Sequence, residues 1–308
     1  MSPTAAIARH HLLTLVRRQT FVLMLGVLLL MTALSGFIGW SSHRTILRVY
    51  DETVRTLTAA GKVAPPNPFA GEPRLSLLNN MVIYVPLIGA LLAIVIGHLS
   101  VMGDRQAGMT RVIFTRPVPR SAYFWGKMAG SAIAGTAIMA ACWALSVLAV
   151  TLINRDLPTA SELARLTAFF ALSGLYLMLF VLVGSVAALL TRSQSMALFV
   201  AVAAWVLVTF ATPQFTSGLR PVASLNPVID PVSTTNSPFF RATSKAEPVA
   251  VNAQYKALSS SLLSEGVRID ASTAAGQMAP IAGFLALLAL LTSRLMARHD
   301  VSEEAARD

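Results

Sequence analysis

The stretch GDRQAGMTRVIFTRPVPRSAYFWGKMAG, Gly103–Gly130, separates two long apolar segments and is the most densely basic part of the chain. Pro117 and Pro119 fix φ and lack a backbone N–H, so no continuous helix is expected to cross them. The stretch is therefore predicted to be a short, charged connection between two membrane-spanning helices. Its simplest interpretation is a cytoplasmic loop that obeys the positive-inside rule. A single acid, Asp104, accompanies its basic residues, which are Arg105, Arg111, Arg116, Arg120 and Lys127.

The rest of the chain has the composition of a membrane protein. Of its 308 residues, 55% are hydrophobic and 12% are charged, whereas a soluble domain carries about 25% charged residues. The formal net charge is +10, but the basic residues gather at the ends of apolar segments, so membrane topology explains them and nucleic acid is not expected as a partner. Cys142 is the one cysteine and lies in an apolar segment, so neither an intramolecular disulfide nor a cysteine-based metal cluster is expected.

Six stretches free of Lys, Arg, Asp and Glu are long enough to cross a bilayer, which takes about 20 residues. Lipid offers the backbone no hydrogen-bond partners, so these spans are predicted to be helices and the fold to be all-α and polytopic, a single transmembrane domain over residues 1–308. The predicted spans are 20–40, 80–102, 124–152, 164–190, 194–213 and 275–296.

A shorter helix is predicted before the first span, over residues 4–18. Apolar and basic residues recur there at helical spacing, which is typical of a helix that lies on the membrane surface. A simple basic flank is the alternative. The apolar members are Ile7, Leu12, Leu15 and Val16.

The density of basic residues orients the spans. Their raw number is the same on the two sides, but on one side they crowd into short segments next to helix ends, where the positive-inside rule applies. Both termini and the connecting segment 103–123 are therefore predicted to be cytoplasmic, in the inner (cytoplasmic) membrane, with extracytoplasmic loops at 41–79 and 214–270. No signal peptide is recognised, because the first apolar segment after Arg17 and Arg18 is long enough to span.

Each outer loop is predicted to contain an amphipathic helix. Ser41 and Ser42 are candidate N-caps for the first, and Gly61 is its expected end. Gly266 is the expected end of the second. Two such helices at one membrane face are expected to bury their apolar stripes against each other or against a partner. The stripes are Ile46, Tyr50, Val54 and Leu57 in the first loop, and Val251, Tyr255, Leu258 and Leu262 in the second.

The opening stretch also follows a spaced pattern: an acid, a glycine four positions later, an apolar run, proline, arginine and Gly-Lys. The matching residues are Asp104, Gly108, Val112–Phe114, Pro117, Arg120, Gly126 and Lys127. This pattern resembles the segment after the second transmembrane helix of ABC-2 type permeases, the membrane subunits of one class of ABC exporter. Asp104 stands where glutamate is usual, and Met109 stands where threonine is usual.

The resemblance implies a function and a set of partners. An ABC-2 permease works as a dimer with two ATPase subunits, which hold ATP and Mg, and Asp104–Lys127 would be the coupling element. Arg120 and Lys127 would then anchor this segment, while Asp104 and Arg105 would meet the ATPase or the neighbouring chain. The chain has no phosphate-binding loop of its own, because Met109 stands where the lysine of a Walker A motif is required. It is therefore expected to be neither an enzyme nor the carrier of a cofactor.

Two alternatives stay open. The stretch Leu225–Pro227 with Asp230 resembles a segment of permeases linked to the maturation of nitrous-oxide reductase and other multi-copper enzymes, in which force would pass to a periplasmic partner. The twelve methionines are scattered, however, and no cluster of soft ligands predicts a metal site. An ATP-independent channel or carrier is the other alternative, and it predicts more polar residues within the spans than the sequence has.

Two features inside the spans complete the set of candidates. Gly126 and Gly130, continued by Ser131 and Gly135, form a face of small residues suited to close helix packing, within one chain or between two. His98 lies well inside a span and is expected to snorkel to the cytoplasmic end or to bond a neighbouring helix, rather than to serve transport.

Overall fold

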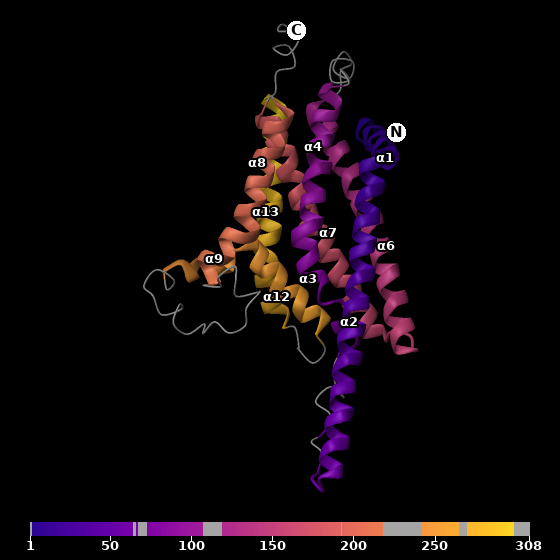
Figure 1. Ribbon diagram of the computed structural model, residues 1–308. Helices are drawn as coiled ribbons and strands as arrows, with labels where there is room; N and C mark the ends of the chain where they lie inside the picture. Colours follow the sequence, from indigo (N-terminus) through magenta and orange to yellow (C-terminus); the bar gives the residue numbers. More distant parts are fainter. Residues whose placement is uncertain are drawn as a thin grey trace.

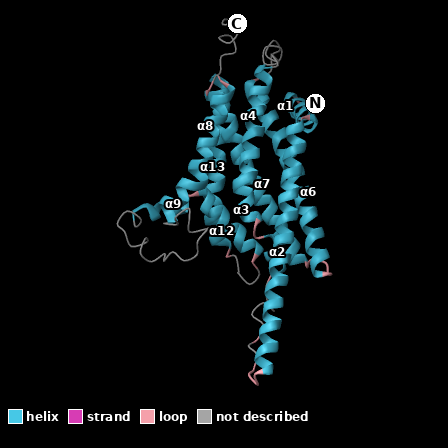
Figure 2. Ribbon diagram, viewed as in Figure 1, coloured by secondary structure: helices cyan, strands magenta, loops and turns pink. Residues whose placement is uncertain are grey.

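The computed structural model describes residues 2–63, 66, 73–106, 119–191, 193–217, 242–264 and 270–298. Within these ranges the chain is a bundle of helices without strands (Figures 1 and 2). Six helical stretches are long and apolar enough to cross a membrane: Gln19–Ala59, Arg74–Arg105, Arg120–Asn154, Ala160–Leu190, Gln194–Ala211 and Ser272–Ala297. The predicted fold class, an all-α protein with six transmembrane helices, is confirmed.

The chain begins with the short helix α1 (Pro3–Arg17), whose first turn is capped by the Ser2 side chain. Arg18 has an extended backbone (φ −79°, ψ 138°) and turns the chain into α2 (Gln19–Ala59). The buried residues of α1 are Ala8, His11 and Leu15, which recur at helical spacing on one face. Together α1, the end of α4 and the end of α13 occupy one end of the bundle (top of Figure 1).

Helix α2 is a single helix of 41 residues, about 60 Å long at 1.5 Å per residue. The prediction of a new helix that starts at Ser41 or Ser42 is wrong, because the chain continues through both residues without a break. No proline or glycine interrupts residues 40–60, so nothing ends the helix there. It ends just before Gly61, whose positive φ of 69° suits glycine. Its last part extends past the other helices (Figure 1).

The second and fifth spans each contain a π-helical turn. The second comprises η1 (Arg74–Leu78), α3 (Met81–Tyr84), η2 (Val85–Gly89) and α4 (Ala90–Gln106). The fifth comprises α8 (Gln194–Val206), η3 (Leu207–Ala211) and α9 (Thr212–Ser217). Such turns disturb the regular backbone ladder, and side chains bond to carbonyls there: Trp205 Nε1 donates to Pro86 O and Asn252 Nδ2 to Thr209 O, both at 2.9 Å.

The third, fourth and sixth spans are α6 (Arg120–Asn154), α7 (Ala160–Leu190) and α13 (Ala271–Arg298). Thr159 and Glu162 form a capping box at the start of α7. The most buried spans are α4 and α7, which cross at two glycines. A Cβ at Gly97 would lie 1.9 Å from Val181 O, and one at Gly184 would lie 2.3 Å from Ile94 O. The two backbones therefore touch, as small residues allow in lipid.

The segment predicted to be the second outer loop contributes η4 (Ser244–Val249) and α12 (Val251–Leu263). The predicted stripe of α12 is buried in the main core, where α12 packs against α7 and α13. The Tyr255 ring stacks on Tyr176 with centroids 4.3 Å apart, and its hydroxyl lies 3.0 Å from Ser173 Oγ. The stripe of α12 was expected to pack against the helix of the first loop or a partner. It packs instead against the spans α7 and α13 of the bundle. The predicted end at Gly266 lies outside the described residues.

Candidate functional site

The basic connection is flanked by the end of α4 and the start of α6. The start of α6 packs against α1, and the end of α4 lies at the same end of the bundle (Figure 1). Helix α6 begins directly after Pro119, whose extended backbone (φ −62°, ψ 131°) forms its N-cap. Gly108 and Pro117 of the predicted coupling motif lie outside the described residues. The structure describes the other predicted site residues, which are Asp104, Arg105, Arg120, Gly126 and Lys127.

A buried ion pair joins α4 to α6. Lys127 Nζ binds Asp104 Oδ2, and Tyr123 Oη donates to the same carboxylate oxygen. Lys127 Nζ also donates to the Ser100 carbonyl and lies 4.9 Å from the centroid of the Tyr123 ring. Lys127 is only 5% exposed, so both charges lose much of their hydration and depend on each other.

Asp104 has two partners within its own chain. The resemblance implied that its carboxylate meets the ATPase or the neighbouring chain, and this stays a prediction. In the structure Asp104 binds Lys127 and Tyr123. Tyr123 and Lys127 are four residues apart on α6 and so point toward α4 together. The carboxylate therefore ties two spans together at the start of the connection.

Helix α1 lies directly on the start of α6 because two glycines of α6 make room for it. A Cβ at Gly126 would lie 2.8 Å from Ile7 Cβ, and one at Gly130 would lie 2.9 Å from Ala8 O. A Cβ at Gly135, by contrast, would meet nothing within 4 Å among the described residues. Of the predicted small face, Gly126 and Gly130 therefore pack against α1 within one chain, whereas Gly135 makes no such contact among the described residues.

A buried hydrogen bond fixes α1 in this position. His11 Nε2 lies 3.0 Å from Ser131 Oγ, one residue beyond Gly130. Burial, with the nearby charge of Lys127, lowers the pKa of His11 to about 4. The imidazole is therefore neutral at pH 7, which suits a group held against an apolar helix.

Arg105 and Arg120 bind the ends of other helices. Arg105 Nη1 donates to Ala188 O at 2.9 Å and to Thr191 O at 3.2 Å, at the end of α7. Arg120 Nη1 donates to Ala297 O at 2.8 Å, in the last turn of α13. Carbonyls at a helix C-terminus lack intrahelical partners, so arginine donors stabilise them. The resemblance implied that Arg105 meets the ATPase or the neighbouring chain and that Arg120 anchors the connection, and both stay predictions. In the structure each of the two side chains links spans of one chain.

The sequence analysis passed over two members of this cluster, His11 and Tyr123, and gave Ser131 only as part of the small face of the third span. A signal for His11 was present, since it lies three residues after Ala8 and four before Leu15 on the buried face of α1. Tyr123 gave no comparable signal, and the small size of Ser131 did not indicate a hydrogen bond to His11. Tyrosine and serine are ordinary near a span end, and only the rotation of α6 against its neighbours brings them to polar partners.

The family of the chain follows from comparison with known proteins. The sequence profile described as ABC-2 family transporter protein matches residues 5–291, from α1 through the sixth span. The chain belongs to the ABC-2 transporter family. It is therefore a membrane permease of an ABC transporter, a transmembrane component rather than a catalytic one. No curated protein matches the chain. The match does not concern copper-enzyme maturation, and residues 225–230, on which that resemblance rests, lie outside the described residues.

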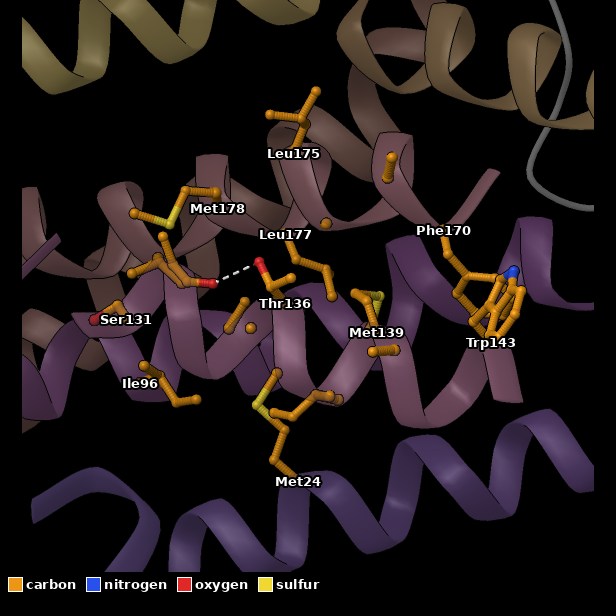
Figure 3. Close-up of a pocket in the computed structure, with 18 of the residues that line it drawn as sticks. Met24, Ile96, Ser131, Thr136, Met139, Trp143, Phe170, Leu175, Leu177 and Met178 are labelled. Carbon is orange, nitrogen blue, oxygen red and sulfur yellow. Dashed lines mark hydrogen bonds between the residues drawn. The ribbon is translucent and has the colours of Figure 1, made fainter. Parts of the chain in front are cut away.

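The permease also holds an apolar cavity of about 650 Å³ between α6 and α7, with side chains of α2 and α4 beneath it. Met139 and Trp143 of α6 face Phe170 and Met178 of α7 across this space (Figure 3). The Thr136 hydroxyl is occupied by a 2.9 Å hydrogen bond to Ala132 O. Trp143 Nε1 has no hydrogen-bond partner among the described residues, but the other side chains that line the cavity are mostly apolar. The cavity therefore suits a hydrocarbon chain better than a charged group.

His98 lies in α4 and is 3% exposed. It does not snorkel as expected, because α4 and α7 touch beside it: a Cβ at Gly184 would lie 3.0 Å from its backbone N. Its Nδ1 has no hydrogen-bond partner among the residues that the structure describes. Within the same residues no group of three or more His, Cys, Asp or Glu side chains is placed to hold a metal ion.

Proposed function

We propose that this permease couples ATP hydrolysis by separate ABC ATPase subunits to export across the cytoplasmic membrane. In this proposal α1 and the segment 103–123 form the surface that the ATPase pushes, including the connecting residues Gly108 and Pro117. Two permease chains act with two ATPase subunits, which hold the ATP and Mg. Family membership supports the general arrangement, since an ABC permease implies an ATPase partner.

The single observation that carries the proposal is how firmly α1 is joined to the spans. Gly126 and Gly130 bring it into backbone contact with α6, and the His11–Ser131 hydrogen bond lies one residue further on. Lys127 in turn binds Asp104 at the end of α4. A displacement of α1 therefore passes directly to two spans, because close-packed contacts transmit movement rather than absorb it.

The test uses one substitution at two glycines. Gly130→Ala places a methyl group 2.9 Å from Ala8 O and forces α1 to move, whereas Gly26→Ala in α2 meets nothing within 4 Å. Each variant is expressed with the ATPase encoded beside the permease gene. The readouts are co-purification of the ATPase, the rate of ATP hydrolysis, and ATP-dependent export of the compound that the wild type exports.

We expect Gly130→Ala to insert into the membrane and to allow ATP hydrolysis but to lose export. Gly26→Ala is expected to retain both ATP hydrolysis and export. Wild-type coupling in Gly130→Ala would contradict the role of α1. Failure of the wild type to bind any ATPase would contradict the proposed function as a whole, and would favour an ATP-independent channel or carrier.

A second candidate function has one specific observation in its favour. Helix α2 starts at the corner with α1 and continues unbroken to Ala59, past the other helices (Figure 1). Such a helix can carry force from the ATPase side to a periplasmic partner, as in a permease that serves metalloenzyme maturation. Ser42→Pro, compared with Ser42→Ala, separates the two functions, because proline breaks the helix outside the predicted span. If the permease only exports a compound, Ser42→Pro is expected to retain export. If it transmits force to a periplasmic partner, Ser42→Pro is expected to abolish maturation of the partner enzyme while ATP hydrolysis continues.

A further inference from the structure

A second cavity, of about 470 Å³, lies between α1 and the ends of α4 and α6. Arg18, at the corner between α1 and α2, lines it and is half-buried. Gly103 makes room for this side chain, since a Cβ there would lie 2.9 Å from both Arg18 Nη1 and Nη2. Within the described part of the chain the Arg18 side chain has no ion-pair or hydrogen-bond partner, although its backbone N–H donates to Leu15 O.

The balance of charge in this cavity is positive. Asp104 is the acid in its wall, and its carboxylate already binds Lys127 and Tyr123. His11 is neutral at pH 7 because burial lowers its pKa to about 4. The Arg18 guanidinium is therefore the cation that remains without an anion. Planar guanidinium groups bind phosphate through two parallel hydrogen bonds.

The charged cavity borders the apolar cavity of Figure 3. His11 lines the first, Ser131 lines the second, and the two side chains are hydrogen-bonded to each other at 3.0 Å. Both cavities follow α6, from Tyr123 and Lys127 near its start to Trp143 deeper in the span. The 16 positions from Lys127 to Trp143 correspond to about 24 Å of helix. A cation at the membrane surface is thus followed by a long apolar space within the membrane.

We propose that the two cavities together bind one anionic phospholipid from the leaflet on the α1 side, with its phosphate at Arg18 and one acyl chain between α6 and α7. The apolar walls favour a lipid over a soluble phosphate, since a soluble anion leaves the α6–α7 cavity empty. Helix α1 carries Arg9 and Arg17 and no acid, and Arg18 follows it directly; this basic surface attracts anionic lipids.

The test measures lipid binding to the full-length chain, purified and delipidated in detergent, by native mass spectrometry. The probes are phosphatidylglycerol and phosphatidylcholine with identical acyl chains. The wild type is expected to bind one phosphatidylglycerol more tightly than any phosphatidylcholine. Arg18→Gln is expected to lower this affinity about tenfold. Arg17→Gln removes the same charge from an exposed neighbour that does not line the cavity, and is expected to retain the affinity.

A second pair of variants tests whether the acyl chain binds between α6 and α7, and leaves α1 unchanged. Gly135→Leu projects into the α6–α7 cavity, while Gly283→Leu on α13 also meets open space but lies away from it. Only Gly135→Leu is expected to weaken phosphatidylglycerol binding. Equal losses of phosphatidylglycerol affinity in Arg17→Gln and Arg18→Gln would show that the lipid is attracted only by the overall positive charge of this surface, and would overturn the proposal. Full binding in Gly135→Leu, or displacement of the lipid by millimolar inorganic phosphate, would also overturn it.

Discussion

At the scale of single residues, the charges around the connection hold the chain's own helices together. Lys127 and Asp104 are separated by 23 positions and by the whole connection, yet they form one buried pair. The sequence pattern predicted that both residues matter. It did not predict that they bind each other, because the rotation of α6 against α4 depends on packing that no local pattern encodes.

Lys127→Met is expected to destabilise the protein by about 3–5 kcal/mol, because it leaves the Asp104 carboxylate buried without its cation. Titration with a denaturing detergent, followed by circular dichroism, measures this loss. The double variant Lys127→Met/Asp104→Asn removes both charges and is expected to recover most of it. Equal stability of the single and double variants would show that the two side chains do not interact.

His11 gives the protein a predictable pH dependence. Its pKa is lowered from 6.5 to about 4 in the folded state, so protons bind the unfolded chain more readily. The stability from the neutral imidazole is present above pH 6.5 and is lost as the pH falls toward 4. The shift corresponds to about 3 kcal/mol. The groups that face His11 are Lys127, Asp104, Arg18 and His10.

The measurement is the free energy of unfolding between pH 7 and pH 4 for the wild type, His11→Gln and His10→Gln. His11→Gln is expected to flatten the decline, whereas His10→Gln, an exposed neighbour, is expected to keep it. A decline of the same slope in all three proteins would assign the pH dependence to groups other than His11.

At the scale of helices, the sequence predicted which segments form but not where each one ends or what it contacts. Hydropathy located all six spans, because apolar length is a local property. The uninterrupted α2 was missed, because serine is a good N-cap but does not end a helix by itself. The stripe of α12 was recognised, but its contacts with α7 and α13 depend on the tertiary fold.

The crossing of α4 and α7 is an element-scale feature that one substitution tests. Gly184→Ala places a methyl group 2.3 Å from Ile94 O, so the two helices must separate. The expected cost is about 1–3 kcal/mol, as for other overpacked cores. Gly276→Ala in α13 meets open space and provides the control. Comparable unfolding free energies for both variants would show that the two helices are not in close contact in the folded protein.

At the scale of the whole molecule, an even number of spans places α1 and the end of α13 on one side of the membrane, and Figure 1 shows them at one end of the bundle. Which end faces the cytoplasm is a prediction from the positions of the charged residues. Arg17, Arg18, Arg105 and Arg120 lie close to span ends at the α1 end, and short basic segments of this kind remain cytoplasmic. The sequence therefore predicts both the number of spans and their direction.

Site-directed labelling tests this direction. Cys142 is fully buried, and Cys142→Ala provides a background without cysteine. Val63 follows the projecting end of α2 and is 95% exposed, while Arg17 is exposed on α1. In intact cells an impermeant maleimide is expected to label the Val63→Cys variant, because its thiol faces outward. The Arg17→Cys variant is expected to react only after permeabilisation, since a cytoplasmic thiol is protected by the bilayer. The reverse labelling pattern would show that the opposite end of the bundle faces the cytoplasm. Segment 103–123 would then lie outside the cell, where an ATPase could not act on it.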